Sequence, residues 1–177
     1  KFLYVGGYHD GKVTVVHTHR DGRLGSVMCG VFHKGIGSVA ERNFRPHVSC
    51  VIPTPDDKYL CAVDNGIDQV KIYTVRSDTG RMELADILRC KLDSGPRLMV
   101  FSPDGTFAYM NSELDNEVTV YSYDGSGKLP DFEKLQEVSV LRDTSTIGSA
   151  CVGMKMSPSG KYLYVSTASS IYFIGID

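Results

Sequence analysis

Two charged residues stand at the ends of the stretch GPRLMVFSPDGTFAYMNSE, Arg97 near its start and Glu113 at its end. The planar guanidinium of Arg97 could bind a carboxylate or a phosphate through parallel hydrogen bonds, or it could be a structural arginine. Glu113 could act as a general base, or it could only pair with Arg97, which would make it a weaker base. His47 could be a general acid or base near neutral pH, or a histidine satisfied by backbone groups. An anion-binding site with acid–base chemistry requires that these distant residues meet.

The chain contains a repeat that would bring such residues together. Three related segments, TPDDKYLCAVDN, SPDGTFAYMNSE and SPSGKYLYVSTA, place Pro55, Pro103 and Pro158 at equivalent positions. Their separation of roughly 50 residues is typical of β-propeller blades. A partial fourth copy, KFLYVGGYHDGKV, opens the chain.

Each full copy is predicted to form four short strands. In the copy that contains Arg97 these are RLMVFS, FAYMNS, EVTVYSY and LQEVSVL. Valine, tyrosine, phenylalanine and threonine dominate these runs, and clusters of glycine, aspartate, asparagine and proline separate them. A helical spacing of apolar residues is left open only for PDFEKLQEV, residues 130–138. The prediction is an all-β fold, a β-propeller built from four-stranded antiparallel blades.

The blades are predicted to form one domain over residues 1–177. Two complete blades cover about 46–94 and 95–142, and incomplete blades at 1–45 and 143–177 flank them. Because propellers have about four to eight blades, we expect either a segment of a larger ring or a chain that completes itself with another copy. Open sheet edges are expected to favour self-association.

The connectivity of a meander decides which loops share a face of the propeller. The crossings between blades and the turns between second and third strands should lie at one face, opposite the SPDG-type turns. Arg97 begins an innermost strand and Glu113 ends the next, so both can point to the mouth of the central channel. Sites usually lie on loops carried by a rigid scaffold. The candidate side chains at this face are His9, Arg42, Arg45, His47, Asp64, Arg97 and Glu113.

Composition argues against several other functions. The formal net charge of -2 gives no footprint for nucleic acid, and no apolar run is long enough to span a membrane. The five cysteines are odd in number and contain no CxxC pair, which predicts free thiols in a reducing cytoplasm. His17 and His19 lack a third metal ligand, and no phosphate-binding glycine loop occurs, so no metal or cofactor is predicted.

The stretches PHVSCVIPTPDDKYLCAVDNGIDQVKIY and GPRLMVFSPDGTFAYMNSELDNEVTVYSYDG resemble the lactonase family of seven-bladed propellers. That family includes bacterial propeller-type 6-phosphogluconolactonases and fungal 3-carboxy-cis,cis-muconate lactonizing enzymes. The resemblance covers essentially the whole chain in blade order, and it rests on GPR, SPDG, SEL and the DxGxD pattern at 64–68. It implies a segment of a seven-bladed ring and a lactone-opening activity.

The resemblance also implies site residues. The family's arginine falls on Arg97 and its glutamate on Glu113. Three positions depart from the family pattern, because Leu98, Ser112 and Ser49 stand where a histidine, an asparagine and a histidine are usual. The crossing TIGSACVGMKM also lacks a polar or basic residue that is often found there.

The leading hypothesis is a lactone hydrolase that acts on a sugar lactone such as 6-phosphogluconolactone. Arg97 would bind the substrate anion or the developing oxyanion, Glu113 would activate water, and His47 would assist. The expected contacts to a small anionic lactone are made by Arg97, Arg45, Asp64 and Ser49. The departures leave a second hypothesis, a non-catalytic binding or scaffold propeller. The family leaves a third, muconate cycloisomerisation.

Overall fold

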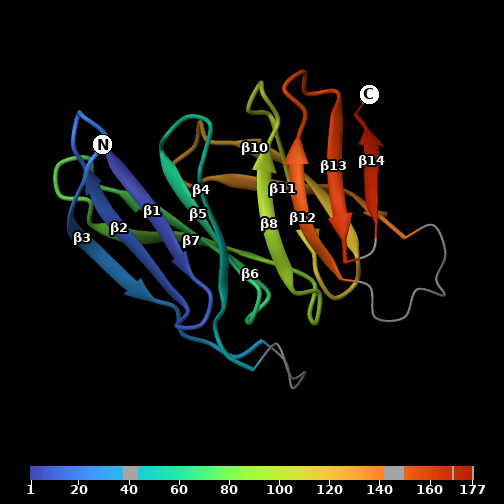
Figure 1. The fold of residues 1–177 in the computed structure, drawn as a ribbon, viewed down its shortest axis with the longest axis horizontal. Helices are drawn as coiled ribbons and strands as arrows, with labels where there is room; N and C mark the ends of the chain where they lie inside the picture. The colour runs from blue at the N-terminus through green and yellow to red at the C-terminus, as the bar shows by residue number, and fades with distance from the viewer. Residues whose placement is uncertain (38–43, 142–149, 169, 177) are drawn as a thin grey trace.

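The computed structural model describes residues 1–37, 44–141, 150–168 and 170–176. In that part of the chain, fourteen strands form four antiparallel sheets and no helix occurs (Figure 1). The first sheet contains β1 (Phe2–Gly7), β2 (Lys12–Thr18) and β3 (Leu24–Phe32). The second contains β4 (Val48–Pro53), β5 (Tyr59–Asp64), β6 (Gln69–Val75) and β7 (Met82–Arg89). The third contains β8 (Pro96–Phe101), β9 (Phe107–Ser112), β10 (Glu117–Asp124) and β11 (Asp131–Ser139). The fourth contains β12 (Cys151–Met156), β13 (Tyr162–Thr167) and β14 (Ile171–Gly175).

Every sheet is a meander in which strands adjacent in the chain are adjacent in the sheet. Strand β1 contacts β4, β4 contacts β8, and β8 contacts β12, so the first strands of successive sheets lie side by side (Figure 1). The predicted all-β fold of antiparallel meanders is therefore confirmed.

The core lies between neighbouring sheets, and the alternation of strand residues builds it. All six residues of β5 are buried, because this inner strand is covered on both faces. Leu60 and Ala62 pack with the first sheet's Val13 and Val15, whereas Cys61 and Val63 belong to the cluster shared with the third sheet. Successive side chains of a strand point to opposite faces, so one apolar run serves two interfaces.

Residues 130–138, for which a helical spacing was left open, form most of strand β11 instead. Its pairing with β10 shifts between Val120 and Tyr121, which leaves Leu135 without a partner in the ladder. This β-bulge inserts one extra residue, and it explains why Phe132, Leu135 and Val138 recur every third residue in an extended strand. The three-residue spacing in this segment therefore reflects a β-bulge and not a helix.

The predicted grouping of loops at two faces is confirmed. The crossings between sheets lie beside the turns between second and third strands, at the lower edge of the molecule in Figure 1. The joining hydrogen bonds run from Asn65 N to His47 O (2.9 Å), Glu113 N to Gly95 O (2.8 Å) and Ala168 N to Ala150 O (3.2 Å). We call this edge the site face. The SPDG-type turns lie at the opposite edge, where the Tyr123 hydroxyl donates to Asp56 Oδ1 at 3.0 Å.

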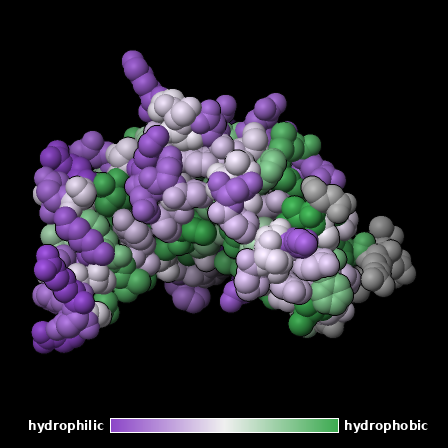
Figure 2. All heavy atoms as spheres, turned by 90° about the horizontal axis from the view of Figure 1, so that it is seen from above, coloured by the Kyte–Doolittle hydropathy of each residue, from purple (hydrophilic) through white to green (hydrophobic). Residues whose placement is uncertain are grey.

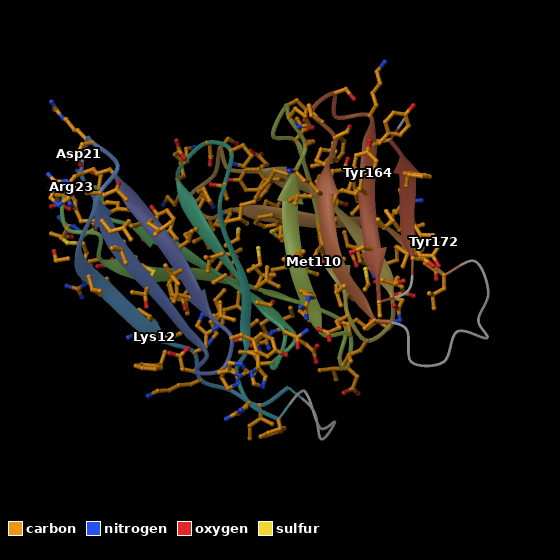
Figure 3. All side chains as sticks on the ribbon, in the orientation of Figure 1. Lys12, Asp21, Arg23, Met110, Tyr164 and Tyr172 are labelled. Carbon is orange, nitrogen blue, oxygen red and sulfur yellow. The ribbon has the colours of Figure 1, made fainter. Side chains whose placement is uncertain are left out.

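Apolar side chains reach the surface on the last sheet. Ile171 and Phe173 of β14 are 69% and 70% exposed, and Tyr162 and Tyr164 of β13 lie beside them. Green patches at the right-hand end of Figure 2 mark this region, and Figure 3 labels Tyr164 there. An exposed apolar strand face favours association. Self-association and the division into two complete and two incomplete blades stay predictions.

None of the five cysteines forms a disulfide, as predicted. Burial raises the pKa of the Cys61 and Cys90 thiols to about 12, and it also raises the pKa of the Cys50 and Cys151 thiols. Only the thiolate is a good nucleophile, so burial makes these four thiols less reactive at neutral pH. Within the described part of the chain, no helix exists that could serve as a membrane span.

Candidate active site

Arg97 and Glu113 meet at the site face, as the sequence predicted. Strand β8 begins where its antiparallel neighbour β9 ends, and Pro96 pairs with Ser112. A guanidinium Nη1 of Arg97 donates to Glu113 Oε2 in a close ion pair. The Arg97 Nε donates to the carbonyl oxygen of Val152, in the next sheet, at 3.0 Å. The arginine therefore connects the glutamate of its own sheet to the first strand of the following one.

Arg97 lies in a β-bulge at the site face. In the β8–β9 ladder Pro96 pairs with Ser112 and Leu98 pairs with Asn111, so Arg97 is the extra residue. Bulges re-aim a side chain and are common beside active sites. The Leu98 amide donates to Asn111 Oδ1 at 2.9 Å, which anchors the strand directly after the bulge.

The same bulge recurs in the first strand of three successive sheets. Ser49 is the extra residue of β4, Arg97 of β8 and Val152 of β12. The Ser49 hydroxyl lies 3.3 Å from Pro96 O, and Arg97 reaches Val152 O, so each polar bulge side chain contacts the next sheet. One repeated backbone feature therefore delivers three different side chains to equivalent positions: a hydroxyl, a guanidinium and an apolar group.

Arg97 and Glu113 differ in their access to solvent. The Glu113 side chain is 7% exposed, and the Arg97 side chain is 31% exposed. Within the described residues, the second terminal nitrogen of Arg97, Nη2, has no hydrogen-bond partner. A guanidinium held on one side by a carboxylate and open on the other can bind a second anion. Arg97 is thus the more accessible member of the ion pair.

His47 is a buried histidine with a defined hydrogen bond. Its Nδ1 lies 2.8 Å from the carbonyl oxygen of Tyr8, and its ring stacks on the Tyr8 ring with centroids 4.5 Å apart. Because a carbonyl oxygen only accepts hydrogen bonds, His47 Nδ1 carries a proton and donates to Tyr8 O. His47 is therefore satisfied by a backbone group, which is one of its two predicted roles.

Asp64, predicted to contact the substrate, is fully buried. Its Oδ2 lies 2.6 Å from His33 Nδ1, and its Oδ1 accepts from the amides of His47 at 2.7 Å and Gly66 at 3.1 Å. Three donors from two loops already occupy its oxygens, and its side chain is 0% exposed. The structure corrects the predicted role: Asp64 positions the segment that carries His47 instead of touching a ligand.

The other predicted residues are less central. Ser49 is half-buried, and its hydroxyl lies 3.3 Å from both Val63 O and Pro96 O. Arg45 is exposed, and its guanidinium lies over the Phe44 ring, 5.6 Å from the centroid. His9 is exposed beside Tyr8. Arg42 and the first half of the crossing segment TIGSACVG, residues 146–149, lie outside the described residues.

Sequence reasoning missed the residues that join these groups. Asn65, which follows β5, donates to Gly95 O and approaches Glu113. Gly66 is required next to it, because a Cβ atom there would lie 1.8 Å from the carbonyl oxygen of Arg45. The DxGxD pattern was visible in the sequence, but its contacts reach segments tens of residues away. Hydrogen bonds of that range leave no local signal.

A cavity of about 300 Å³ lies between the second and third sheets, and Arg97, Glu113 and His47 do not line it. Its lining combines Cys90 and Met110 with charged side chains such as Lys91, and Figure 3 labels Met110. No cluster of three or more histidine, cysteine, aspartate or glutamate side chains suited to a metal ion occurs in the described ranges. The Arg97–Glu113 ion pair is therefore the better candidate for chemistry, because it places an anion-binding cation beside a carboxylate. His47 is linked to this pair through Asn65, whose amide donates to His47 O and whose side chain approaches Glu113.

The sequence matches a known family over nearly all of its length. The family model described as "Lactonase, 7-bladed beta-propeller" matches residues 1–173. A 6-phosphogluconolactonase of Bacillus subtilis is 32% identical over 166 residues, which make up 94% of this chain and 46% of the relative. The chain thus spans about half the length of the curated relatives it matches.

Solved structures share the fold. A protein from Lactobacillus plantarum matches with a TM-score of 0.90 at 29% identity, over 99% of this chain and 50% of that one. The periplasmic gluconolactonase of Pseudomonas aeruginosa matches with a TM-score of 0.89 at 28% identity, over 100% of this chain and 50% of that one. These likenesses, with the family match, confirm the predicted β-propeller class.

Proposed function

The chain belongs to the lactonase family of seven-bladed β-propellers, and from this premise we propose that the protein opens the ring of a sugar lactone by hydrolysis. Two relatives support the reaction class, since one is named a 6-phosphogluconolactonase and the other a gluconolactonase. The observation that carries the proposal is the Arg97–Glu113 pair. In this pair, a partly exposed guanidinium contacts a buried carboxylate at the site face.

The proposed reaction uses this pair and His47. Water attacks the lactone carbonyl carbon, and Glu113 accepts a proton from it, with His47 Nε2 as a second base. The guanidinium of Arg97 stabilises the negative charge that develops on the carbonyl oxygen, or binds the anionic group of the substrate. The bond between the carbonyl carbon and the ring oxygen then breaks, and the ring oxygen takes up the proton. The product is the open-chain hydroxy acid.

The proposed substrate is 6-phosphogluconolactone. Arg45 is exposed in the crossing before β4, and it adds positive potential for a phosphate at the face that carries Arg97. A cytoplasmic location fits this substrate, and the five unpaired cysteines support it.

The complete protein should open 6-phosphoglucono-δ-lactone faster than glucono-δ-lactone. A charge-assisted contact to phosphate contributes about 1.5–3 kcal/mol, so kcat/KM should be about ten- to a hundredfold higher for the phosphorylated lactone. Lactone loss followed at several enzyme concentrations, with the spontaneous rate subtracted, measures this ratio. Equal kcat/KM values for the two lactones would contradict the proposed preference for a phosphorylated substrate. Rates that do not rise with enzyme concentration would defeat the lactonase assignment itself.

One observation favours a second candidate function. The bulge position that holds Arg97 in β8 holds the apolar Val152 in β12, and Ser49 in β4 replaces a histidine usual in the family. A propeller with this reduced set of polar groups could bind an anion without turning it over. A protein that binds gluconate in a direct binding measurement, but does not hydrolyse the lactone in the assay above, would have this binding role. Cycloisomerisation of a muconate stays a prediction for substrate profiling.

A further inference from the structure

Asn65 lies at the centre of the site face, between loops of three sheets. It directly follows β5, and it is 1% exposed. Its Nδ2 lies 3.0 Å from Gly95 O and 3.4 Å from Glu113 Oε2. Its Oδ1 lies 3.4 Å from the Tyr8 hydroxyl, and its backbone amide donates to His47 O at 2.9 Å. One residue therefore contacts the loops that carry His47 and Glu113.

The chemistry of the amide fixes its orientation. An asparagine side chain offers two N–H donors on one side and one carbonyl acceptor on the other. Here the nitrogen faces two acceptors, a backbone carbonyl and a carboxylate, while the oxygen faces the Tyr8 hydroxyl. The flipped amide would place an oxygen against those two acceptors and a nitrogen against Tyr8. The observed orientation satisfies all of its neighbours, so the donor toward Glu113 is held in place.

Glu113 Oε2 is thus approached by donors from two sheets. Arg97 Nη1 reaches it from β8, and Asn65 Nδ2 reaches it from the turn after β5. A carboxylate held from two directions keeps one rotamer, which is what general base catalysis requires of its geometry. Asn65 Nδ2 therefore adds a second restraint to the one that Arg97 gives.

We propose that Asn65 is a positioning residue for Glu113. Its Nδ2 donor holds the Glu113 carboxylate in place at the site face. This inference rests on the lactonase function proposed above. It also explains why Asp64 is buried beside it. Asp64 accepts from the His47 and Gly66 amides, and it thereby fixes the backbone on both sides of Asn65. In the described part of the chain, the charged or titratable side chains around this network include Arg97, Glu113, Tyr8, His47, Asp64, Asp68, His33 and Cys151.

Two substitutions of Asn65 in the complete protein test the role. Asn65→Leu removes the donor at similar volume, and kcat should fall about ten- to a hundredfold with little change in KM, since a hydrogen bond to a charged group is lost. Asn65→Asp places a second negative charge beside Glu113, which disfavours the ionised base. The acid limb of the kcat/KM profile should then move to higher pH by about one unit or more.

A matched control separates positioning from stability. Thr54 is also a fully buried polar residue, but it lies at the edge opposite the site face, where its hydroxyl bonds to Asp56 Oδ1 and to the amide of Tyr59. Thr54→Val should lower the melting temperature as Asn65→Leu does, yet keep more of kcat. An active wild type with equal kcat losses in Asn65→Leu and Thr54→Val, or with an unmoved acid limb in Asn65→Asp, would overturn this inference alone. An inactive wild type would overturn the lactonase function together with it.

Discussion

Replacement of both Arg97 and Glu113 by alanine is expected to reduce lactone hydrolysis to nearly the spontaneous rate. General base catalysis contributes about 10²–10⁴ to a rate, and a group that stabilises the oxyanion contributes about 10²–10³. The loss should therefore exceed about a thousandfold in kcat/KM. Because the two residues form one ion pair, each single variant should lose nearly as much as the double variant.

The double variant is expected to fold better than either single variant, so it gives the cleaner test of activity. Arg97→Ala alone removes the cation that Arg97 supplies to the buried Glu113 carboxylate, which is costly, whereas the double variant removes both members of this ion pair. Arg23→Ala is a suitable control, because Arg23 pairs with Asp21 in the turn between β2 and β3, at the upper edge of the molecule in Figure 3 and opposite the site face. The control should retain the wild-type rate. If the double variant also retained it, Arg97 and Glu113 would have no catalytic part.

Replacement of Asp64 by alanine is expected to lower the free energy of unfolding by about 3 kcal/mol or more, because each buried donor left without an acceptor costs about 1–3 kcal/mol. Three buried donors, at His33, His47 and Gly66, would lose their acceptor at once. Urea unfolding midpoints of the complete protein, combined with the slope of the transition, measure the change.

The matched control is Asp21→Ala. Asp21 also pairs with a basic side chain, the Nε of Arg23 at 2.7 Å, but its side chain is half exposed. An exposed ion pair contributes less than about 1 kcal/mol. A loss of similar size in both variants would show that Asp64 does not organise the site face.

The convergence of Arg97 and Glu113 could be predicted from the sequence because it depends only on strand order. The repeated SPDG-type turns fix which strands are neighbours, and antiparallel neighbours bring the start of β8 next to the end of β9. The same reasoning placed the crossings and the second-to-third turns at one face. Period and connectivity are local properties, and a single sequence contains them.

The bulges could not be predicted. Whether Arg97 is paired or extra in the ladder depends on the register of hydrogen bonds with β9, which composition does not encode. The bulge at Leu135 could not be predicted either, and the apolar spacing that accompanies it in β11 resembles that of a helix.

The burial of Asp64 was also hidden. An aspartate in the turn DNGID reads as exposed, and only the donors of His33 and His47, 31 and 17 residues earlier in the chain, make it a buried acceptor. Asn65 was missed for the same reason, because Gly95 and Glu113 lie 30 and 48 residues away. Local patterns reveal where strands run, and long-range polar contacts decide which loop residues are structural.

A crystal structure of the complete protein with 6-phosphogluconate, the product of the proposed reaction, would test the central claim most directly. We predict that an oxygen of the product lies about 3 Å from the guanidinium of Arg97, on its Nη2 side, with Glu113 still bonded to Nη1 and Asn65. Product bound instead in the cavity that Cys90 and Met110 line, with no contact to Arg97, would contradict the account.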